Sequence, residues 1–311
     1  MQLYAIGLEV LGMLKECVEC RSVQAIGEDG ICPYKKAEDS LPLRCVGKWS
    51  KDKLYYLQKY INLFSLSMKN RWAKRAYIDL FAGPGLCVVR ESGEIILGSP
   101  LVAIDQLPPF SRYIFIDISK ESVESLERRV ELRRPDAWRK LFNKDCNLVV
   151  DEIRSEIDNS YLVLAFVDPT SMQINFSSIE KLTQGLRMDL IINFPLQAIN
   201  RSYPYAFKGY ANSYDSFFGS GKWREILQEY PDIHSIGTKL LFLYKSQLGK
   251  IGYGDIRDMG SSQYFESDEI LVKGPKNIPL YYLVFASKHP IGRRFWHEIQ
   301  GIRSDSQRLL L

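Results

Sequence analysis

Long apolar runs are missing from this 311-residue sequence. A helix that crosses a bilayer needs roughly 18 to 20 consecutive apolar residues, and no stretch approaches that length. The first residues are moderately apolar, but Gly7, Glu9 and Gly12 interrupt them, and they have neither a basic start nor a small-residue cleavage site. We therefore expect neither a membrane span nor a signal peptide.

The sequence also has few cysteines and only a small net charge. Six cysteines without an even framework indicate thiols or metal ligands in a reducing compartment, which predicts a cytoplasmic protein. A net charge of +4 permits an anionic partner such as DNA or RNA, but it falls short of the strongly basic balance that would argue for one. Internal repeats and low-complexity tracts are absent, and 46% hydrophobic content is enough for a packed core.

Strand-like and helix-like segments alternate after residue 50, which predicts an α/β domain with a mostly parallel sheet and helices on both faces. The segments 269–273 and 280–286 are joined by Gly274-Pro275-Lys276-Asn277, which predicts a C-terminal hairpin and one antiparallel strand. The expected strands before that hairpin are 76–79, 112–117, 141–145, 161–167 and 188–193, and the expected helices are 51–68, 99–104 and 121–132.

Two parts of the chain fall outside this alternation. Residues 1–50 are expected to form a cysteine-bearing appendage without regular elements, because glycines and prolines interrupt them. Residues 51–311 then form the main domain, with a helical lobe inserted at about 200–258. This lobe is rich in aromatic and basic residues, which suits a nucleic-acid surface, since aromatic rings stack on bases and cations hold phosphates. The alternative, which we favour for most of these residues, is an aromatic core with solvated lysines.

A glycine turn follows the first expected strand, which ends at Asp79. Glycines let a ligand approach the main chain, and a carboxylate at the strand tip only accepts hydrogen bonds. The dinucleotide fingerprint would need a third glycine where Val88 stands, and the phosphate-gripping loop would need Gly-Lys-Ser/Thr after the turn; neither is present. The turn instead resembles the first motif of S-adenosylmethionine-dependent methyltransferases.

Aspartates follow or end four successive expected strands: Asp79, Asp117, Asp145 and Asp168. In an open α/β sheet a ligand binds beyond the carboxyl ends of the strands, so these carboxylates are expected to share one edge. Asp117 suits a ribose diol, because two adjacent hydroxyls can donate to one carboxylate. The alternative for each aspartate alone is a helix cap or a turn residue after a strand.

Several separated motifs are together similar to the three-Cys-motif partner family, from about residue 46 to the C-terminus. They are Val46-Gly47-Lys48-Trp49, Tyr77 to Gly85, Gly98-Ser99-Pro100-Leu101, Phe217-Phe218-Gly219 with Trp223, and Tyr281 to His289. The resemblance implies a class I methyltransferase-like (Rossmann-like) fold with a seven-stranded sheet, S-adenosylmethionine as cofactor, and a role in bacterial mobile elements or phage defence. It also implies a neighbouring gene product as a partner. The cofactor residues implied are Asp79, Phe81, Ala82, Gly83, Pro84, Gly85, Asp117, Ile118, Asp145 and Cys146.

The acceptor site is expected around Asp168-Pro169 and Asn193, which end the fourth and fifth strands. Enzymes that methylate exocyclic amines usually have a second proline and an aromatic residue after the fourth strand, and Thr170-Ser171 stand there instead. Cytosine C5 chemistry needs a Pro-Cys pair, which does not occur. Asp168 is the preferred catalytic residue, either taking a proton or orienting the acceptor, and its structural alternative is a turn residue before Pro169.

Four cysteines near the N-terminus form a separate pattern: Cys17, Cys20, Cys32 and Cys45. Four thiolates would satisfy a tetrahedral structural zinc ion. The second half of the pattern lacks its own Cys-x-x-Cys, so ordinary thiols remain the alternative.

These observations predict a cytoplasmic S-adenosylmethionine-dependent methyltransferase that acts on nucleic acid. Two alternatives stay open. The chain could be a non-catalytic, nucleoside-binding partner of a neighbouring gene product, or a methyltransferase of a protein or small molecule.

Overall fold

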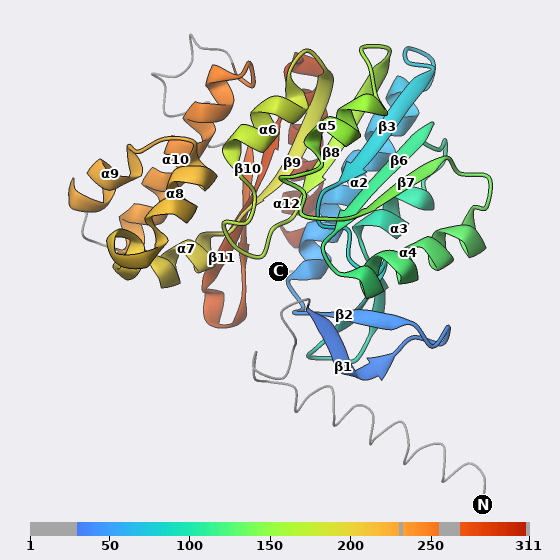
Figure 1. The fold of residues 1–311 in the computed structure, drawn as a ribbon, viewed down its shortest axis with the longest axis horizontal. Coiled ribbons are helices and arrows are strands. Elements are labelled where there is room, and N and C mark those ends of the chain that lie inside the picture. Colours follow the sequence, from blue (N-terminus) through green and yellow to red (C-terminus); the bar gives the residue numbers. More distant parts are fainter. Residues whose placement is uncertain (1–29, 230–232, 255–267, 309–311) are drawn as a thin grey trace, which may run out of the picture.

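A seven-stranded sheet forms the centre of the molecule in the computed structural model, which describes residues 30–229, 233–254 and 268–308 (Figure 1). The strand order is β7-β6-β3-β8-β9-β11-β10. The first five strands pair in parallel, and β11 is antiparallel to both of its neighbours. This is the predicted sheet, including the hairpin strand at its edge. The strands are β3 Lys74–Asp79, β6 Arg112–Asp117, β7 Arg139–Asn143, β8 Tyr161–Val167, β9 Arg187–Phe194, β10 Glu269–Lys273 and β11 Pro279–Ala286.

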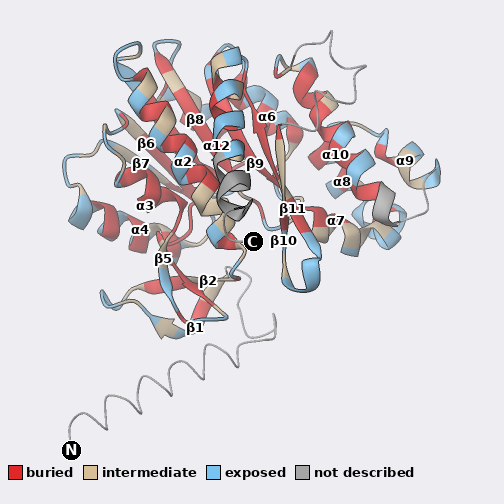
Figure 2. Ribbon diagram, turned by 180° about the vertical axis from the view of Figure 1, so that it is seen from behind, coloured by how far each residue is buried: buried red, intermediate tan, exposed pale blue. Residues whose placement is uncertain are grey.

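Helices cover both faces of the sheet, and each face has its own apolar core (Figure 2). Because side chains alternate along a strand, Ile78 of β3 joins one core and Tyr77 joins the other. The helices over the Tyr77 face are α2 Ser50–Met68, α3 Ser99–Ile104, α4 Lys120–Arg133 and α12 Pro290–Arg308. Those over the Ile78 face are α5 Val150–Ser155, α6 Phe176–Thr183, α7 Leu196–Ser202, α8 Ala211–Phe218 and α10 Ile233–Lys250. None of the helices in the described ranges combines the length and hydropathy required to span a lipid bilayer.

A second, four-stranded sheet lies beyond the lower end of the main sheet in Figure 1. It joins β1 Ile31–Lys36 and β2 Pro42–Val46 to β4 Leu86–Val89 and β5 Ile95–Leu97, with β2 parallel to β4. The expectation that residues 1–50 hold no regular element is therefore wrong for 31–46. Pro33 lies in an edge strand and Pro42 begins its strand, which are the positions where a sheet tolerates proline.

Arg129 of α4 fastens this small sheet to the main domain. Its guanidinium bonds both carboxylate oxygens of Asp39 at 2.8 and 2.9 Å, and it donates to the carbonyls of Pro42 and Pro84 at 2.9 and 2.6 Å. The side chain is only 2% exposed. One buried cation thus ties the β1–β2 connection to the glycine turn.

The inserted lobe lies to one side of the sheet and consists mainly of helices (Figure 1). After α7 it contains the 3-10 turn Tyr203–Tyr205, the π-helix Ala206–Tyr210, α8, α9 Trp223–Glu229 and α10. Tyr214, Phe217, Phe218 and Trp223 are fully buried in it. Most of its aromatic residues in the part we can describe are therefore core, as the favoured interpretation expected.

Candidate functional site

The glycine turn leaves β3 at the carboxyl edge and is tied to the neighbouring strands. Leu80 N donates to Phe166 O at 3.1 Å and Ala82 N donates to Ile116 O at 2.9 Å. Gly83 and Gly85 have φ values of +63° and +91°, which favour glycine. A Cβ at Gly85 would lie 3.0 Å from Leu126, so this glycine lets α3 and α4 pack closely.

Gly83 has a different role from Gly85. A Cβ there would meet only the flexible Arg44 side chain, at 3.4 Å, among the residues that are described. Gly83 is itself buried, so a ligand could reach its main chain only where the flexible Arg44 side chain moves aside.

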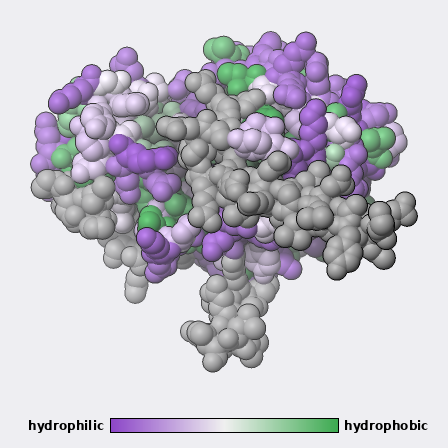
Figure 3. Space-filling model, turned by 90° about the horizontal axis from the view of Figure 1, so that it is seen from below, coloured by the Kyte–Doolittle hydropathy of each residue, from purple (hydrophilic) through white to green (hydrophobic). Residues whose placement is uncertain are grey.

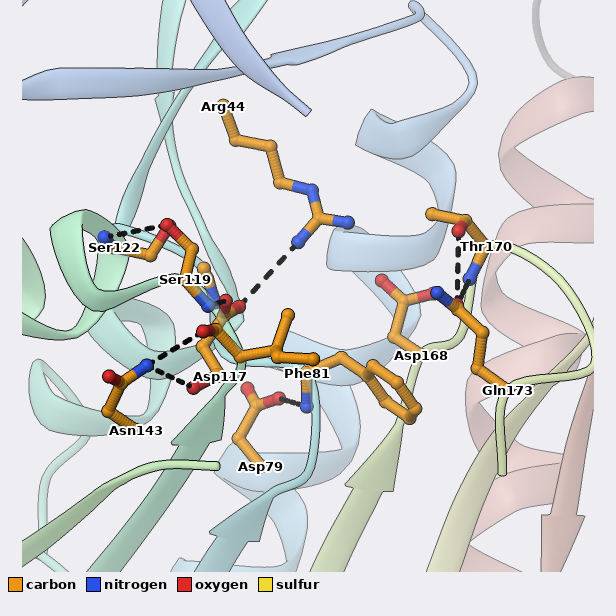
Figure 4. Close-up of polar contacts among 12 residues, drawn as sticks. Arg44, Asp79, Phe81, Asp117, Ser119, Ser122, Asn143, Asp168, Thr170 and Gln173 are labelled. Carbon is orange, nitrogen blue, oxygen red and sulfur yellow. Dashed lines mark hydrogen bonds and ion pairs between the residues drawn. The ribbon is translucent and has the colours of Figure 1, made fainter. Parts of the chain in front are cut away.

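Asp117 ends β6 beside the glycine turn (Figure 4). Its Oδ2 accepts from Gly83 N and its Oδ1 accepts from Ser119 N, both at 2.8 Å. Arg44 Nη1 lies 4.0 Å from Oδ2. Each carboxylate oxygen has two acceptor positions, so Asp117 can hold the turn and still accept hydrogen bonds from a ligand.

Asp79 lies beneath the turn and is fully buried. It accepts hydrogen bonds from Tyr77 Oη at 3.2 Å and Phe81 N at 3.3 Å. Burial raises the pKa of this carboxyl to about 7, and the charge of Asp168 adds to the rise, while a hydrogen bond from Ser99 opposes it. Asp79 therefore supports the turn from inside and presents no surface to a ligand.

Of the other predicted cofactor residues, Asp145 and Ile118 are exposed and Cys146 is buried. β7 ends at Asn143, so Asp145 lies just past the strand, exposed, where it accepts from Asn147 N at 2.8 Å. Ile118, the first residue after β6, is 74% exposed. Cys146 is buried, and burial raises the pKa of its thiol to about 12.

The three predicted catalytic residues lie together after β8 and at the end of β9. Asn193 Nδ2 donates to Asp168 Oδ1 at 2.8 Å and to Pro169 O at 3.1 Å. Asp168 Oδ1 and Pro169 O can only accept hydrogen bonds, so the amide of Asn193 must direct its Nδ2 toward them. Lys53 of α2 bonds both oxygens of Asp168, at 2.7 and 2.6 Å, and its ammonium lies 5.4 Å from the Tyr281 ring centroid.

A cavity of about 240 Å³ lies between these residues and the glycine turn. Asp168 is the one acidic residue in its described lining. The cations that line it are Arg44, Lys53, Arg90 and Arg201. The cavity is therefore electropositive and suits a ligand that carries negative charge.

Sequence reasoning considered Arg201 as one of the basic residues of the lobe, but it missed Arg44, Lys53 and Arg90. These three come from β2, α2 and the residue after β4, and nothing in the sequence around each distinguishes it from a solvated surface residue. Arg44 was the least visible, because its strand was not expected.

Two of the four predicted zinc ligands are adjacent. The thiol of Cys45 hydrogen-bonds that of Cys32, which lowers the pKa of Cys32 to about 6 and raises that of Cys45. Cys17 and Cys20 lie outside the described residues. Within the described part of the chain, no three His, Cys, Asp or Glu side chains are grouped as metal ligands.

No protein-family model matches the sequence and no curated protein matches it, so the resemblance to the three-Cys-motif partner family stays a prediction. Solved structures with a similar fold include Trm1 from Pyrococcus horikoshii with S-adenosyl-L-methionine, at 13% identity and a TM-score of 0.41 over 80% of this chain and 57% of that one. The N-methyltransferase NodS from Bradyrhizobium japonicum WM9 is 10% identical, with a TM-score of 0.37 over 78% and 97%. TYW2 from M. jannaschii in complex with AdoMet is 11% identical, with a TM-score of 0.37 over 84% and 86%. The strand order of the chain itself, with its antiparallel β11, is that of a class I methyltransferase-like fold.

Proposed function

We propose that this protein is an S-adenosylmethionine-dependent methyltransferase whose cofactor binds at the carboxyl edge of the sheet. The observation that carries the proposal is Asp117, which ends β6 and accepts a hydrogen bond from the main chain of Gly83 in the glycine turn. Carboxylates after the second strand of such sheets commonly bind ribose hydroxyls. A carboxylate that keeps acceptor positions beside a glycine turn is suited to an adenosyl group.

The residues at this edge fit the cofactor group by group. Asp117 would accept from the ribose diol, Ile118 would offer an apolar surface to the adenine, and Asp145 would accept from the adenine amino group. Arg44, which crosses Gly83, would pair with the carboxylate of the methionine part. Asp79 and Gly85 contribute by holding the turn in place. S-adenosylmethionine, when bound, supplies an activated methyl group, so the protein needs mainly to align the acceptor.

Asp168, Pro169 and Asn193 are proposed to line the acceptor side of the cavity. Both oxygens of Asp168 are engaged by Lys53, and one of them also by Asn193. A carboxylate stabilised in this way is suited to orienting the acceptor and poorly suited to removing its proton. We therefore assign Asp168 a positioning role.

The acceptor is proposed to be nucleic acid, because Arg90 and Arg201 of the cavity lining remain for phosphates when Lys53 pairs with Asp168 and Arg44 with the cofactor. The role in bacterial mobile elements or phage defence rests on the motif resemblance alone. The neighbouring gene product as partner rests on the same resemblance, and the cytoplasmic location is a proposal that rests on the cysteine content.

Calorimetry with S-adenosylmethionine tests the cofactor site. Wild-type protein should bind it, Asp117→Ala should abolish binding, and Asp136→Ala, an exposed carboxylate in the loop before β7, should bind as wild type does. Wild-type protein that gives no binding would contradict the proposal.

A transfer assay with radiolabelled methyl groups, offered DNA, RNA and protein, tests the activity. Label on DNA or RNA supports the proposed acceptor. Tight cofactor binding with no transfer to any of them would favour the non-catalytic alternative instead.

A further inference from the structure

Three aromatic rings project from the lobe at the segment that follows α7, residues 203–210, here called the aromatic segment. Tyr205 is 58% exposed, Phe207 is 52% exposed and Tyr210 is 47% exposed. The last two belong to the π-helix Ala206–Tyr210, a conformation that is rare and often found at functional sites. A Cβ at Gly209 would meet nothing within 4 Å, so the surface is open there.

These rings are not needed to fill the core of the lobe, because other aromatic residues already do so. Tyr214, Phe217, Phe218 and Trp223 are fully buried. Phe207 packs against Trp223, with ring centroids 5.3 Å apart, so the buried core holds one of the exposed rings in position. A ring that is already ordered loses little entropy when it stacks on a ligand.

The charge around the aromatic segment is positive. Residues 196–214 include Arg201 and Lys208 and no carboxylate. The first acidic residue after them, Asp215, is neutralised by a bidentate pair with Arg224, at 2.5 and 2.8 Å. Residues 196–215 therefore present no unpaired negative charge to a polyanion, and the next carboxylates, Glu225 and Glu229, lie on α9.

The aromatic segment is continuous with the cationic cavity. Gln197, Ala198 and Arg201 of α7 line that cavity, and Tyr205 follows Arg201 by four residues, about one helical turn. Hydrophilic and apolar side chains intermix on the lobe at the left of Figure 3, which views the molecule from below. Arg201 thus belongs to the lining of the cavity and lies two residues before the aromatic segment.

We infer that the aromatic segment binds a single-stranded nucleic acid and leads one of its nucleotides to the cavity. Tyr205, Phe207 and Tyr210 stack on bases, while Arg201 and Lys208 pair with phosphates. Only unpaired bases offer their faces to such rings, so the ligand is a single strand and not a duplex. The binding surface is independent of the cofactor, but the identity of the cavity as the acceptor site rests on the proposed function.

Fluorescence anisotropy with labelled oligothymidylate, oligouridylate and a duplex of equal length tests the binding surface on the full chain. Wild-type protein should bind at least one of the two single strands more tightly than the duplex. Replacing all three rings, as Tyr205→Ala with Phe207→Ala and Tyr210→Ala, should weaken that binding at least about tenfold. Leu132→Ala, which removes a 78% exposed apolar side chain from α4, should leave it unchanged.

Two further sets of variants separate stacking, charge and folding. Tyr205→Phe with Phe207→Tyr and Tyr210→Phe keeps the rings and should retain affinity. Arg201→Gln and Lys208→Gln should each reduce the slope of log affinity against log salt by about 0.7. Lys69→Gln, an exposed lysine at the end of α2, should not change the slope.

Equal affinity for duplex and single strands, or an unchanged affinity in the three-alanine variant, would overturn the inference. So would the absence of binding to both single strands. Calorimetry with S-adenosylmethionine on the same proteins keeps the two proposals apart. Cofactor binding without oligonucleotide binding rejects this inference alone, whereas oligonucleotide binding without cofactor binding rejects the proposed function and leaves the strand-binding surface standing.

Discussion

The ammonium of Lys53 donates hydrogen bonds to both carboxylate oxygens of Asp168, at 2.7 and 2.6 Å. The two side chains are only 13% and 20% exposed, so little water screens them. α2 and the end of β8 therefore meet through a charged pair at the cavity. Asp168 is held in one orientation by this pair and by Asn193.

Removing Lys53 alone should cost more stability than removing both partners. Lys53→Met leaves the partly buried Asp168 carboxylate without its cation, and we expect a loss of about 1–3 kcal/mol, between the values for surface and buried pairs. Adding Asp168→Asn should recover part of that loss. Urea unfolding of the two single variants and the double variant measures the coupling, and additive effects would show that the pair contributes nothing.

The buried carboxyl of Asp79 should make stability fall as the pH rises. Its folded pKa of about 7 lies above the ordinary value of 3.8, so the folded state binds the proton more tightly than the unfolded state. The resulting stabilisation is complete below about pH 4 and is lost as the pH rises through about 7, and it amounts to at most about 4 kcal/mol.

Asp79→Asn should remove this pH dependence. The free energy of unfolding of wild type minus that of the variant should decrease between pH 5 and pH 8. Asp189 has a raised pKa of about 6 for the same reason, burial, but it is present in both proteins and cancels in the difference. A difference that stays constant with pH would contradict the assignment for Asp79.

Arg129→Met should destabilise the protein by about 3–5 kcal/mol, because it strips a buried cation from Asp39 and from two carbonyls. It should also weaken S-adenosylmethionine binding, since one of those carbonyls belongs to Pro84 in the glycine turn. Thermal unfolding and calorimetry measure the two effects. Arg133→Met, on the same helix but in an exposed pair with Asp105, is the matched control and should cost at most about 1 kcal/mol.

The cysteine pattern leaves two alternatives, one structural zinc ion for each chain or ordinary thiols. If zinc is bound, elemental analysis of purified protein should find one ion for each chain, and Cys32→Ser or Cys45→Ser should lower the content, while Cys146→Ser should not, because Cys146 lies outside the pattern. Protein free of metal after growth with added zinc would support ordinary thiols instead.

Elements with a strong local pattern were predicted closely. The strands 112–117 and 161–167 match β6 and β8 residue for residue, because each is a continuous apolar run bounded by polar residues. The strand predicted at 141–145 was placed two residues too late, since β7 is the edge strand Arg139–Asn143, in which only Phe142 is buried. β2 was missed because its parallel partner β4 is distant in the sequence, and β1 was missed with it because β1 pairs with β2.

The candidate site was predictable only where it lies on the main sheet. Asp117, Gly83 and Asp168 follow strands, so the parallel topology places them at one edge. Lys53 and Arg44 reach the same place from other elements, and their positions depend on how α2 and β2 pack. The residues next to Lys53 and Arg44 in the sequence give no indication of this long-range packing.

The small sheet has a practical consequence for anyone who shortens this chain. Starting at α2 would delete β1 and β2, and with them Arg44 and the Asp39 partner of Arg129. It would also uncover the backbone of β4 along the side that β2 now occupies, and a bare strand edge pairs readily with other chains. A trimmed protein should therefore aggregate and lose its cofactor affinity together, although every strand of the large sheet would remain.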